Sequence, residues 1–291
     1  MTQRLIVTHH APDLDAITSV WLLKRFDGHH YADAKVAFVD PGDTMSQPAA
    51  KELGFEIDHV THTDTGLGQF DHHQPDRAQQ HICASSLVYD YLCDLQVDKQ
   101  EDEALKSLVE YVTDIDHFGE VDWPESSLPR YAFTLPELIH GLELLELHDD
   151  DSQLHFGFSC LDSVYAVLKQ FCKAKELLTI KAIFFELPIG KVMAIESAND
   201  DVIKLAQKQG ADLAIKKDDH TGHIRIKARP DTSFTLEALA NKVKALEPNV
   251  NWYYHPGGKM LLNGSRKHLH QNPSQLTLET LIELVKDTYG K

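Results

Sequence analysis

Residues 4–26 read RLIVTHHAPDLDAITSVWLLKRF, and the two halves of this stretch differ in pattern. The run from Arg4 to Thr8 is short and mainly apolar, which predicts a buried strand. The run from Asp15 to Phe26 has apolar residues at helical spacing, which predicts a helix packed on a sheet. A strand that leads directly into a helix is half of a βα unit, the repeating unit of parallel sheets.

The alternation of strand-like and helix-like segments continues through the first half of the chain. Two more strands are expected, at Lys35–Val39 and Ile57–His62, and helices are expected at Ser85–Leu95, Glu101–Val112 and Pro136–Leu147. Such alternation favours an α/β fold, a parallel sheet with helices on both faces. We assign residues 1–150 to this domain.

The pattern changes in the second half of the chain. A helical segment at about Leu161–Leu178 predicts a helical connector over residues 151–181. The remaining residues, 182–291, predict a smaller α+β domain. Its strands are expected at Ala182–Leu187, Lys191–Glu196, Leu213–Lys217 and Ile224–Ala228, and its helices near Asp200–Gln209, Thr235–Ala245 and Leu278–Lys286.

Composition excludes several classes of protein. Lys and Arg number 28 against 45 Asp and Glu, so the net charge is −17 and a long nucleic-acid duplex would be repelled. A short phosphorylated molecule remains compatible, because bound divalent cations can reverse the local field. The first residues lack a signal-peptide pattern and no apolar run approaches the roughly 20 residues of a membrane span, so we expect a cytoplasmic protein without membrane contact. Four dispersed cysteines without a CxxC pair disfavour a zinc ribbon.

The first motif is HHAPDLD, residues 9–15, at the junction of the first strand and its helix. Ligands of open α/β sheets bind at the carboxyl ends of the strands, so this is a suitable position for a site. His9, Asp13 and Asp15 offer one imidazole and two carboxylates, a mixture suited to Mn²⁺ or Mg²⁺. The alternative is that Asp13 only caps the helix.

The second motif is TDTGLGQFDHHQ, residues 63–74, which follows the third expected strand. It places Asp64 ahead of a glycine-containing turn and a second group, Asp71, His72 and His73, behind it. A hydrated polar loop is the alternative interpretation. The presence of the first motif makes a shared metal site the better prediction.

The pattern H-x-x-P-D-x-D followed by D-H-H resembles the DHH phosphoesterase superfamily, which includes RecJ-type nucleases, Nrn-type oligoribonucleases and family II inorganic pyrophosphatases. The first motif is most similar to the pyrophosphatase form. The short step from Asp64 to Asp71 and the Gln that ends FDHHQ instead resemble the Myg branch of metal-dependent hydrolases, which includes exonucleases. The motifs cover roughly the first 120 residues and leave the branch open.

The resemblance implies two divalent cations held by six side chains: His9, Asp13, Asp15, Asp64, His72 and Asp116. His9 and Asp13 would hold one ion, Asp15 and His72 the other, and Asp64 would bridge them. The imidazoles favour Mn²⁺, with Mg²⁺ as the alternative.

The resemblance also implies two catalytic residues, and it places the last of the six ligands after a helix. His73 would face the substrate phosphate and donate to it or to the leaving group. Asp71 would orient a histidine. The segment VTDIDHFG offers Asp114 or Asp116 as the fourth-motif ligand, and we choose Asp116 because DHFG is the more similar to that motif.

A third motif, HPGGKMLLNGSRKH, occupies residues 255–268. It resembles the glycine-rich substrate-binding motif of DHH proteins, although only two of its glycines are adjacent. Glycines allow backbone N–H groups to approach a phosphate, and basic side chains add charge. The residues assigned to substrate binding are His255, Gly257, Gly258, Lys259, Arg266 and Lys267. The alternative is a β-hairpin with an exposed basic turn.

Together these patterns predict a phosphoesterase that hydrolyses phosphodiester or phosphoanhydride bonds in nucleotides or short oligonucleotides. An inorganic pyrophosphatase and a non-catalytic nucleotide-binding protein of the same fold are the alternatives. Superfamily members are often dimers, so a homodimer is compatible with the resemblance, but the sequence has no heptad pattern from which to derive one.

Overall fold

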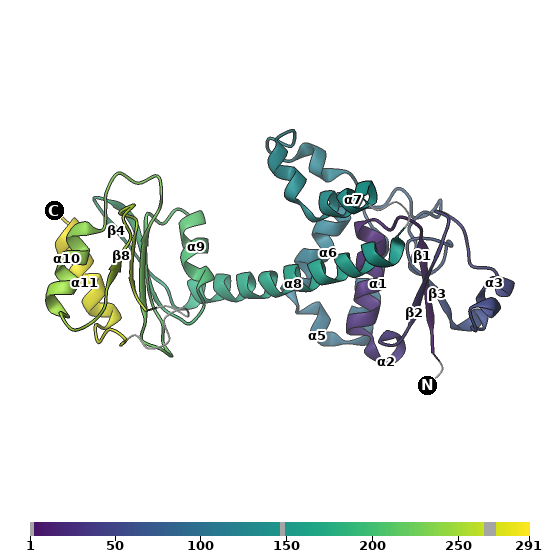
Figure 1. Cartoon of the computed structure of the whole chain (residues 1–291), viewed down its shortest axis with the longest axis horizontal. Helices are drawn as coiled ribbons and strands as arrows, with labels where there is room; N and C mark the ends of the chain where they lie inside the picture. The colour runs from purple at the N-terminus through teal and green to yellow at the C-terminus, as the bar shows by residue number, and fades with distance from the viewer. Residues whose placement is uncertain (1–2, 146–148, 265–271) are drawn as a thin grey trace. The chain divides into compact units, whose positions relative to one another are not determined.

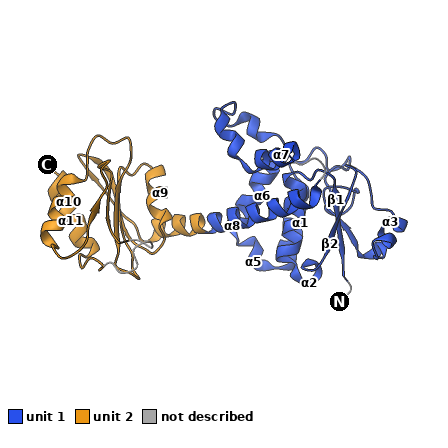
Figure 2. Cartoon of the chain, viewed as in Figure 1, with its two compact units in different colours: residues 1–169 blue, residues 170–291 orange. Residues whose placement is uncertain are grey.

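The computed structural model describes residues 3–145, 149–264 and 272–291. The chain forms two compact units, Met1–Lys169 and Gln170–Lys291, coloured separately in Figure 2. The division falls within the long helix α8 (Asp150–Ile180), inside the segment expected as a connector. Within the described ranges, none of the helices combines the length and the apolar character needed to cross a bilayer.

The first unit is built on a parallel sheet of three strands, β1 (Leu5–His9), β2 (Lys35–Val39) and β3 (Val60–His62), in the order β2-β1-β3. All three carboxyl ends therefore meet at one edge of the sheet. The first motif begins at the end of β1 and the second follows β3, so the topology brings the two motifs together at this edge.

Helices cover both faces of this sheet, α1 (Leu14–Phe26) on one side and α3 (Gln47–Glu52) on the other (Figure 1). Leu5 and Val7 of β1 form a core cluster with Ala50 of α3. Because side chains alternate along a strand, the buried Ile6 lies on the opposite face. The predicted α/β class is thus confirmed.

Four further helices follow in this unit: α2 (Gly28–Tyr31), α4 (Ala84–Leu95), α5 (Val97–Gln100) and α6 (Glu103–Asp116). Two 3₁₀ turns, Gly119–Asp122 and Pro129–Phe133, then lead to α7 (Leu135–Leu145). The last residues of the helix expected at Pro136–Leu147 lie outside the described residues.

The third strand is shorter than expected. Ile57–His59 form a 3₁₀ turn, and only Val60–His62 pair with β1. The register explains the difference: Val60 lies opposite Leu5, the first residue of β1, so the three preceding residues have no strand beside them.

The second unit has a mixed sheet in the order β4-β5-β6-β7-β9-β8. Its strands are β4 (Ile183–Leu187), β5 (Gly190–Glu196), β6 (Leu213–Lys217), β7 (Ile224–Ala228), β8 (Tyr253–Tyr254) and β9 (Met260–Asn263). One face packs on α10 (Glu237–Leu246) and α11 (Leu278–Tyr289), and the other on α9 (Asp201–Lys208) and the end of α8. The mixed sheet with helices on both faces confirms the predicted α+β arrangement of this part of the chain. The pairing of β8 with β9 adds a hairpin that the strand predictions omitted.

Candidate metal centre

The first motif forms a loop that is fixed at both ends. Asp13 is the N-cap of α1, and its Oδ1 accepts the N–H of Ala16 at 3.0 Å. The first turn of α8 holds the other side: the carboxylate of Asp150 accepts the N–H of Ala11 at 2.7 Å, and Gln153 donates to the carbonyl of Pro12 at 2.9 Å. The capping role weighed for Asp13 is therefore real, and it orients a carboxylate that also lies near His9 and Asp64.

Asp64 is the centre of the site. The residue is 5% exposed, and its backbone has a left-handed φ of 55°, which is uncommon for a residue other than glycine. Its Oδ2 lies 3.2 Å from Nε2 of His9, and its Oδ1 lies 3.3 Å from Nε2 of His72. One carboxylate thus faces imidazoles from both motifs.

Two groups of side chains could each hold a cation, and the ligand atoms of each group lie within 4.8 Å of one another. One group comes from both motifs: His9, Asp13 and Asp64. The other adds the end of α6: Asp15, His72 and Asp116. Since Asp64 also contacts His72, it lies between the two groups.

His73 belongs to a third group with Asp64 and His72, but its nearer partner is Asp71. Nδ1 of His73 lies 2.8 Å from Oδ1 of Asp71, against 3.8 Å from Asp64. Oδ1 of Asp71 also accepts the backbone N–H of His73, and Oδ2 accepts that of Leu67 at 2.7 Å. An Nδ1–H donated to a carboxylate is not a metal ligand, so this contact fixes the ring and leaves Nε2 available.

Several buried atoms of the site have no hydrogen-bond partner among the residues that the structure describes. They include Oδ1 of Asp64 and Nε2 of His72. Nδ1 of His9 lies 2.9 Å from the carbonyl oxygen of His10 and must donate to it, so a neutral His9 turns its Nε2 lone pair toward Asp64. When Nε2 of each imidazole is unprotonated, the lone pairs of these atoms converge without a donor, as a cation site requires, so this donor set fits divalent metal ions.

The electrostatics of the site also favour bound cations. Burial, and then the charges of Asp64 and Asp116, raise the pKa of Asp15 well above its usual range. Burial raises the pKa of Asp116 to about 6, although the charge of His72 opposes the shift. Burial lowers the pKa of His9, but the hydrogen bond to Asp64 and the charge of Asp13 outweigh it and raise that pKa to about 9. Like charges held this close need protons or cations between them.

Asp15 has a second function that the sequence did not reveal. The residue is 2% exposed, and its carboxylate accepts the backbone N–H groups of Ala84 and Ser85, at 2.7 and 2.8 Å, where α4 begins. Cys83, the N-cap of this helix, does not supply a carboxylate, so Asp15 provides the negative charge that the positive end of the helix dipole favours. The contact fixes Asp15 rigidly beside His72.

The structure distinguishes the two candidates at the end of α6. Asp116 places Oδ2 3.7 Å from Nε2 of His72. Asp114 is directed elsewhere: its Oδ2 accepts the indole N–H of Trp123 at 3.0 Å, and its carboxylate packs on Gly119. Asp116, and not Asp114, therefore joins the ligand groups.

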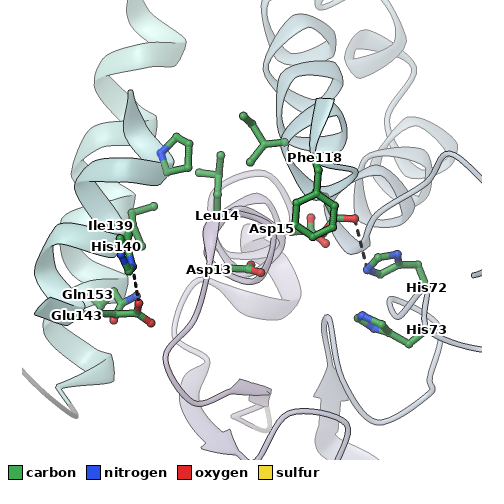
Figure 3. Close-up of a pocket in the computed structure, with 13 residues that line it drawn as sticks. Asp13, Leu14, Asp15, His72, His73, Phe118, Ile139, His140, Glu143 and Gln153 are labelled. Atoms are coloured by element: carbon green, nitrogen blue, oxygen red, sulfur yellow. Dashed lines mark hydrogen bonds and ion pairs between the residues drawn. The ribbon is translucent and has the colours of Figure 1, made fainter. Parts of the chain in front are cut away.

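A cavity of about 480 Å³ opens beside these ligands (Figure 3). Asp13, Asp15, His72 and Asp116 line one side. Phe118, at the turn after α6, lines another part, together with residues of α7 that include Ile139, His140 and Glu143. Sequence reasoning missed the α7 residues, and the available signal was weak: His140 and Glu143 are three positions apart, so they share a helix face.

The third motif lies in the second unit, where β8 and β9 form the hairpin that was the alternative prediction. The ammonium group of Lys259 donates to the carbonyls of Thr232 and Phe234 at 2.6 and 2.5 Å. A role for Lys259 in binding substrate would require these bonds to break. Nδ1 of His255 accepts the N–H of Gly257 at 3.0 Å, and Gly258 is buried with a left-handed φ of 74°. Arg266 and Lys267 lie outside the described residues.

No protein-family model matches the chain, and no curated protein matches it. Among solved structures, it is similar to a DHH-domain protein described as a member of a family of ribosomal proteins, at 14% identity and a TM-score of 0.32, over 99% of this chain and 87% of that one. The chain is also similar to RecJ from Thermus thermophilus in complex with Mn²⁺, at 13% identity and a TM-score of 0.30. This match covers 98% of the chain and 52% of RecJ, so the chain spans about half the length of that protein. A further match is an exonuclease RecJ bound to manganese, at 13% identity and a TM-score of 0.30, over 98% of this chain and 89% of that one.

Proposed function

We propose that this chain is a metal-dependent phosphoesterase that hydrolyses phosphodiester or phosphoanhydride bonds in nucleotides or short oligonucleotides. The observation that supports the proposal is the position of Asp64, a buried carboxylate between two groups of metal-ligand type. A single structural metal ion would need only one such group. Two groups that share a carboxylate are typical of sites where a pair of cations, roughly 3.5–4 Å apart, acts on a phosphoryl group.

In this proposal, His9 and Asp13 would hold one cation, Asp15, His72 and Asp116 would hold the other, and Asp64 would be a ligand of both. Six ligands with four carboxylates and two imidazoles favour Mn²⁺, with Mg²⁺ as the alternative. When bound, the two cations would activate a water molecule and stabilise negative charge on the phosphoryl group.

The protein supplies position and a proton donor. Asp15 is held by two backbone N–H groups, and Asp13 by the first turn of α1, so neither carboxylate needs to reorganise during the reaction. Asp71 fixes the ring of His73, whose side chain is 60% exposed. The free Nε2 of His73 is therefore available to the substrate, and with both ring nitrogens protonated it would donate to a phosphate oxygen or protonate the leaving oxygen.

The proposal is tested by product release from pyrophosphate, dinucleotides, cyclic dinucleotides and short RNA and DNA oligomers, each with Mn²⁺ and with a chelator. We expect Mn²⁺-dependent cleavage of a nucleotide-containing class and none with chelator. Cleavage of pyrophosphate alone would instead identify a pyrophosphatase. Binding of metal and nucleotide without any product would identify a non-catalytic binding protein.

A further inference from the structure

Phe118 is the most unusual residue in the wall of the cavity. It is 75% exposed, although phenylalanine is usually buried. Its backbone has a left-handed φ of 59°, an outlier for a bulky side chain. Conformations of this kind persist where surrounding contacts enforce them, and they cluster at functional sites.

The contacts that enforce this conformation are specific. The N–H of Phe118 donates to the carbonyl of Ile115 at 2.9 Å, which closes the turn after α6. The next residue, Gly119, packs so closely on the carboxylate of Asp114 that any side chain there would overlap it. Trp123 donates to the same carboxylate. The turn therefore presents the phenyl ring at the cavity from a fixed backbone, two positions after Asp116.

The chemistry of the cavity suggests what this ring contacts. Among the described residues, the lining includes no lysine or arginine. A substrate made only of phosphate groups would carry several negative charges that no cationic side chain here neutralises. The remaining walls are instead partly apolar, with Leu14, Pro136 and Ile139 in addition to Phe118. In the view of Figure 3, Phe118 and His140 lie on either side of Asp13. A flat ring attached to a single phosphoryl group fits this combination.

We propose that Phe118 is the stacking platform for a nucleobase of the substrate, next to the metal centre. This rests on the proposed function and names its substrate class: a nucleotide or oligonucleotide, not an inorganic polyphosphate. Stacking on an aromatic side chain tolerates any base, since every base has a π-face. Phe118 thus acts as a binding residue, and the metal-ligand side chains act on the phosphoryl group.

Binding of reaction-product analogues tests the proposal without requiring turnover. Isothermal titration calorimetry on the Mn²⁺-loaded full chain compares AMP with ribose 5-phosphate, which lacks the base. Phe118→Asn removes the ring and tolerates a left-handed backbone, and Phe118→Tyr keeps the ring. Stacking contributes enough for us to expect AMP to bind about ten-fold or more tightly than ribose 5-phosphate in the wild type and in Phe118→Tyr.

In Phe118→Asn, the ratio of the two affinities should fall close to one, while ribose 5-phosphate binds as in the wild type. A wild type that binds both ligands equally, or a Phe118→Asn variant that keeps the full preference for AMP, would overturn the base site. Mn²⁺-dependent hydrolysis of an ordinary dinucleotide by the wild type reports separately on the phosphoesterase. Absence of that hydrolysis together with a retained AMP preference would count against the proposed reaction and leave the base site standing.

Discussion

Replacing Asp64 with Asn should remove most of the effect of Mn²⁺ on thermal stability. The side chain is nearly isosteric, but it lacks the charge that lies between His9 and His72, at 3.2 and 3.3 Å. Loss of a residue that merely orients a ligand weakens metal binding by about 10–100-fold, and Asp64 is itself a proposed ligand of both ions, so at least about 100-fold is expected at each site.

The size of the thermal effect follows from linkage. At a Mn²⁺ concentration of about 100 Kd, one wild-type site gains about 2.7 kcal/mol. A unit of this size shifts by about 2–4 °C per kcal/mol, so the wild-type midpoint should rise by about 5–10 °C. With a Kd about 100-fold weaker, the same concentration gives RT ln 2, about 0.4 kcal/mol, and a shift of about 1 °C.

The assay is thermal denaturation by circular dichroism, with and without Mn²⁺, on the wild type, Asp64→Asn and a control variant, Asp76→Asn. Asp76 follows the same motif but is exposed, so the control should keep the full shift. A Mn²⁺-induced shift in Asp64→Asn equal to that of the wild type would refute the placement of Asp64 between two ions.

The other contacts of the site give three more predictions. Asp116→Asn should lower kcat/KM by at least about 100-fold, because it removes a proposed metal ligand. Asp114→Asn should instead lower the free energy of unfolding by about 1–3 kcal/mol, because it weakens the hydrogen bond from Trp123, and it should largely preserve the metal content. The reverse pattern in kinetics and urea denaturation would exchange the two assignments. Asp71→Asn should lower kcat about 10–100-fold and alter the pH–rate profile, because His73 loses the carboxylate that orients it, while two metal ions remain bound. An unchanged pH–rate profile would show that His73 takes no part in the reaction. Burial lowers the pKa of His9 and of His72, but hydrogen bonds to Asp64 and nearby carboxylate charges outweigh burial and raise both pKa values to about 9. Both rings are therefore protonated at pH 7 in the metal-free protein, and Mn²⁺ must displace those protons when it binds. Calorimetry in buffers of different ionisation enthalpy should detect a proton release that diminishes above pH 9, and a proton release independent of pH would contradict the ligand set.

The parts of the fold that follow local patterns were predictable from the sequence. The strand at Leu5–His9 and the helix at Leu14–Phe26 have strong periodicity, and the edge of a parallel sheet determines where their loop must lie. The strand pairing that shortens β3 depends on the register with β1, which no local pattern encodes. The β8–β9 hairpin was obscured because its glycines also suit a phosphate-binding loop.

The site was predictable only where a motif carries it. Spacing placed Asp64 and His72 in one loop, but their distance from His9 depends on the sheet order. The choice of Asp116 over Asp114 depends on the direction of each side chain at the end of α6, since Trp123 engages one of them. Phe118 has no sequence signature, because its importance comes from an exposed ring and a left-handed backbone.

The most direct test of the two-metal account is the metal content of the full chain, dialysed after loading with Mn²⁺ and measured by mass spectrometry and electron paramagnetic resonance. The account predicts two Mn²⁺ ions per chain with a spin-coupled spectrum, since both ions contact Asp64. One ion per chain with an isolated six-line spectrum, or none, would contradict it.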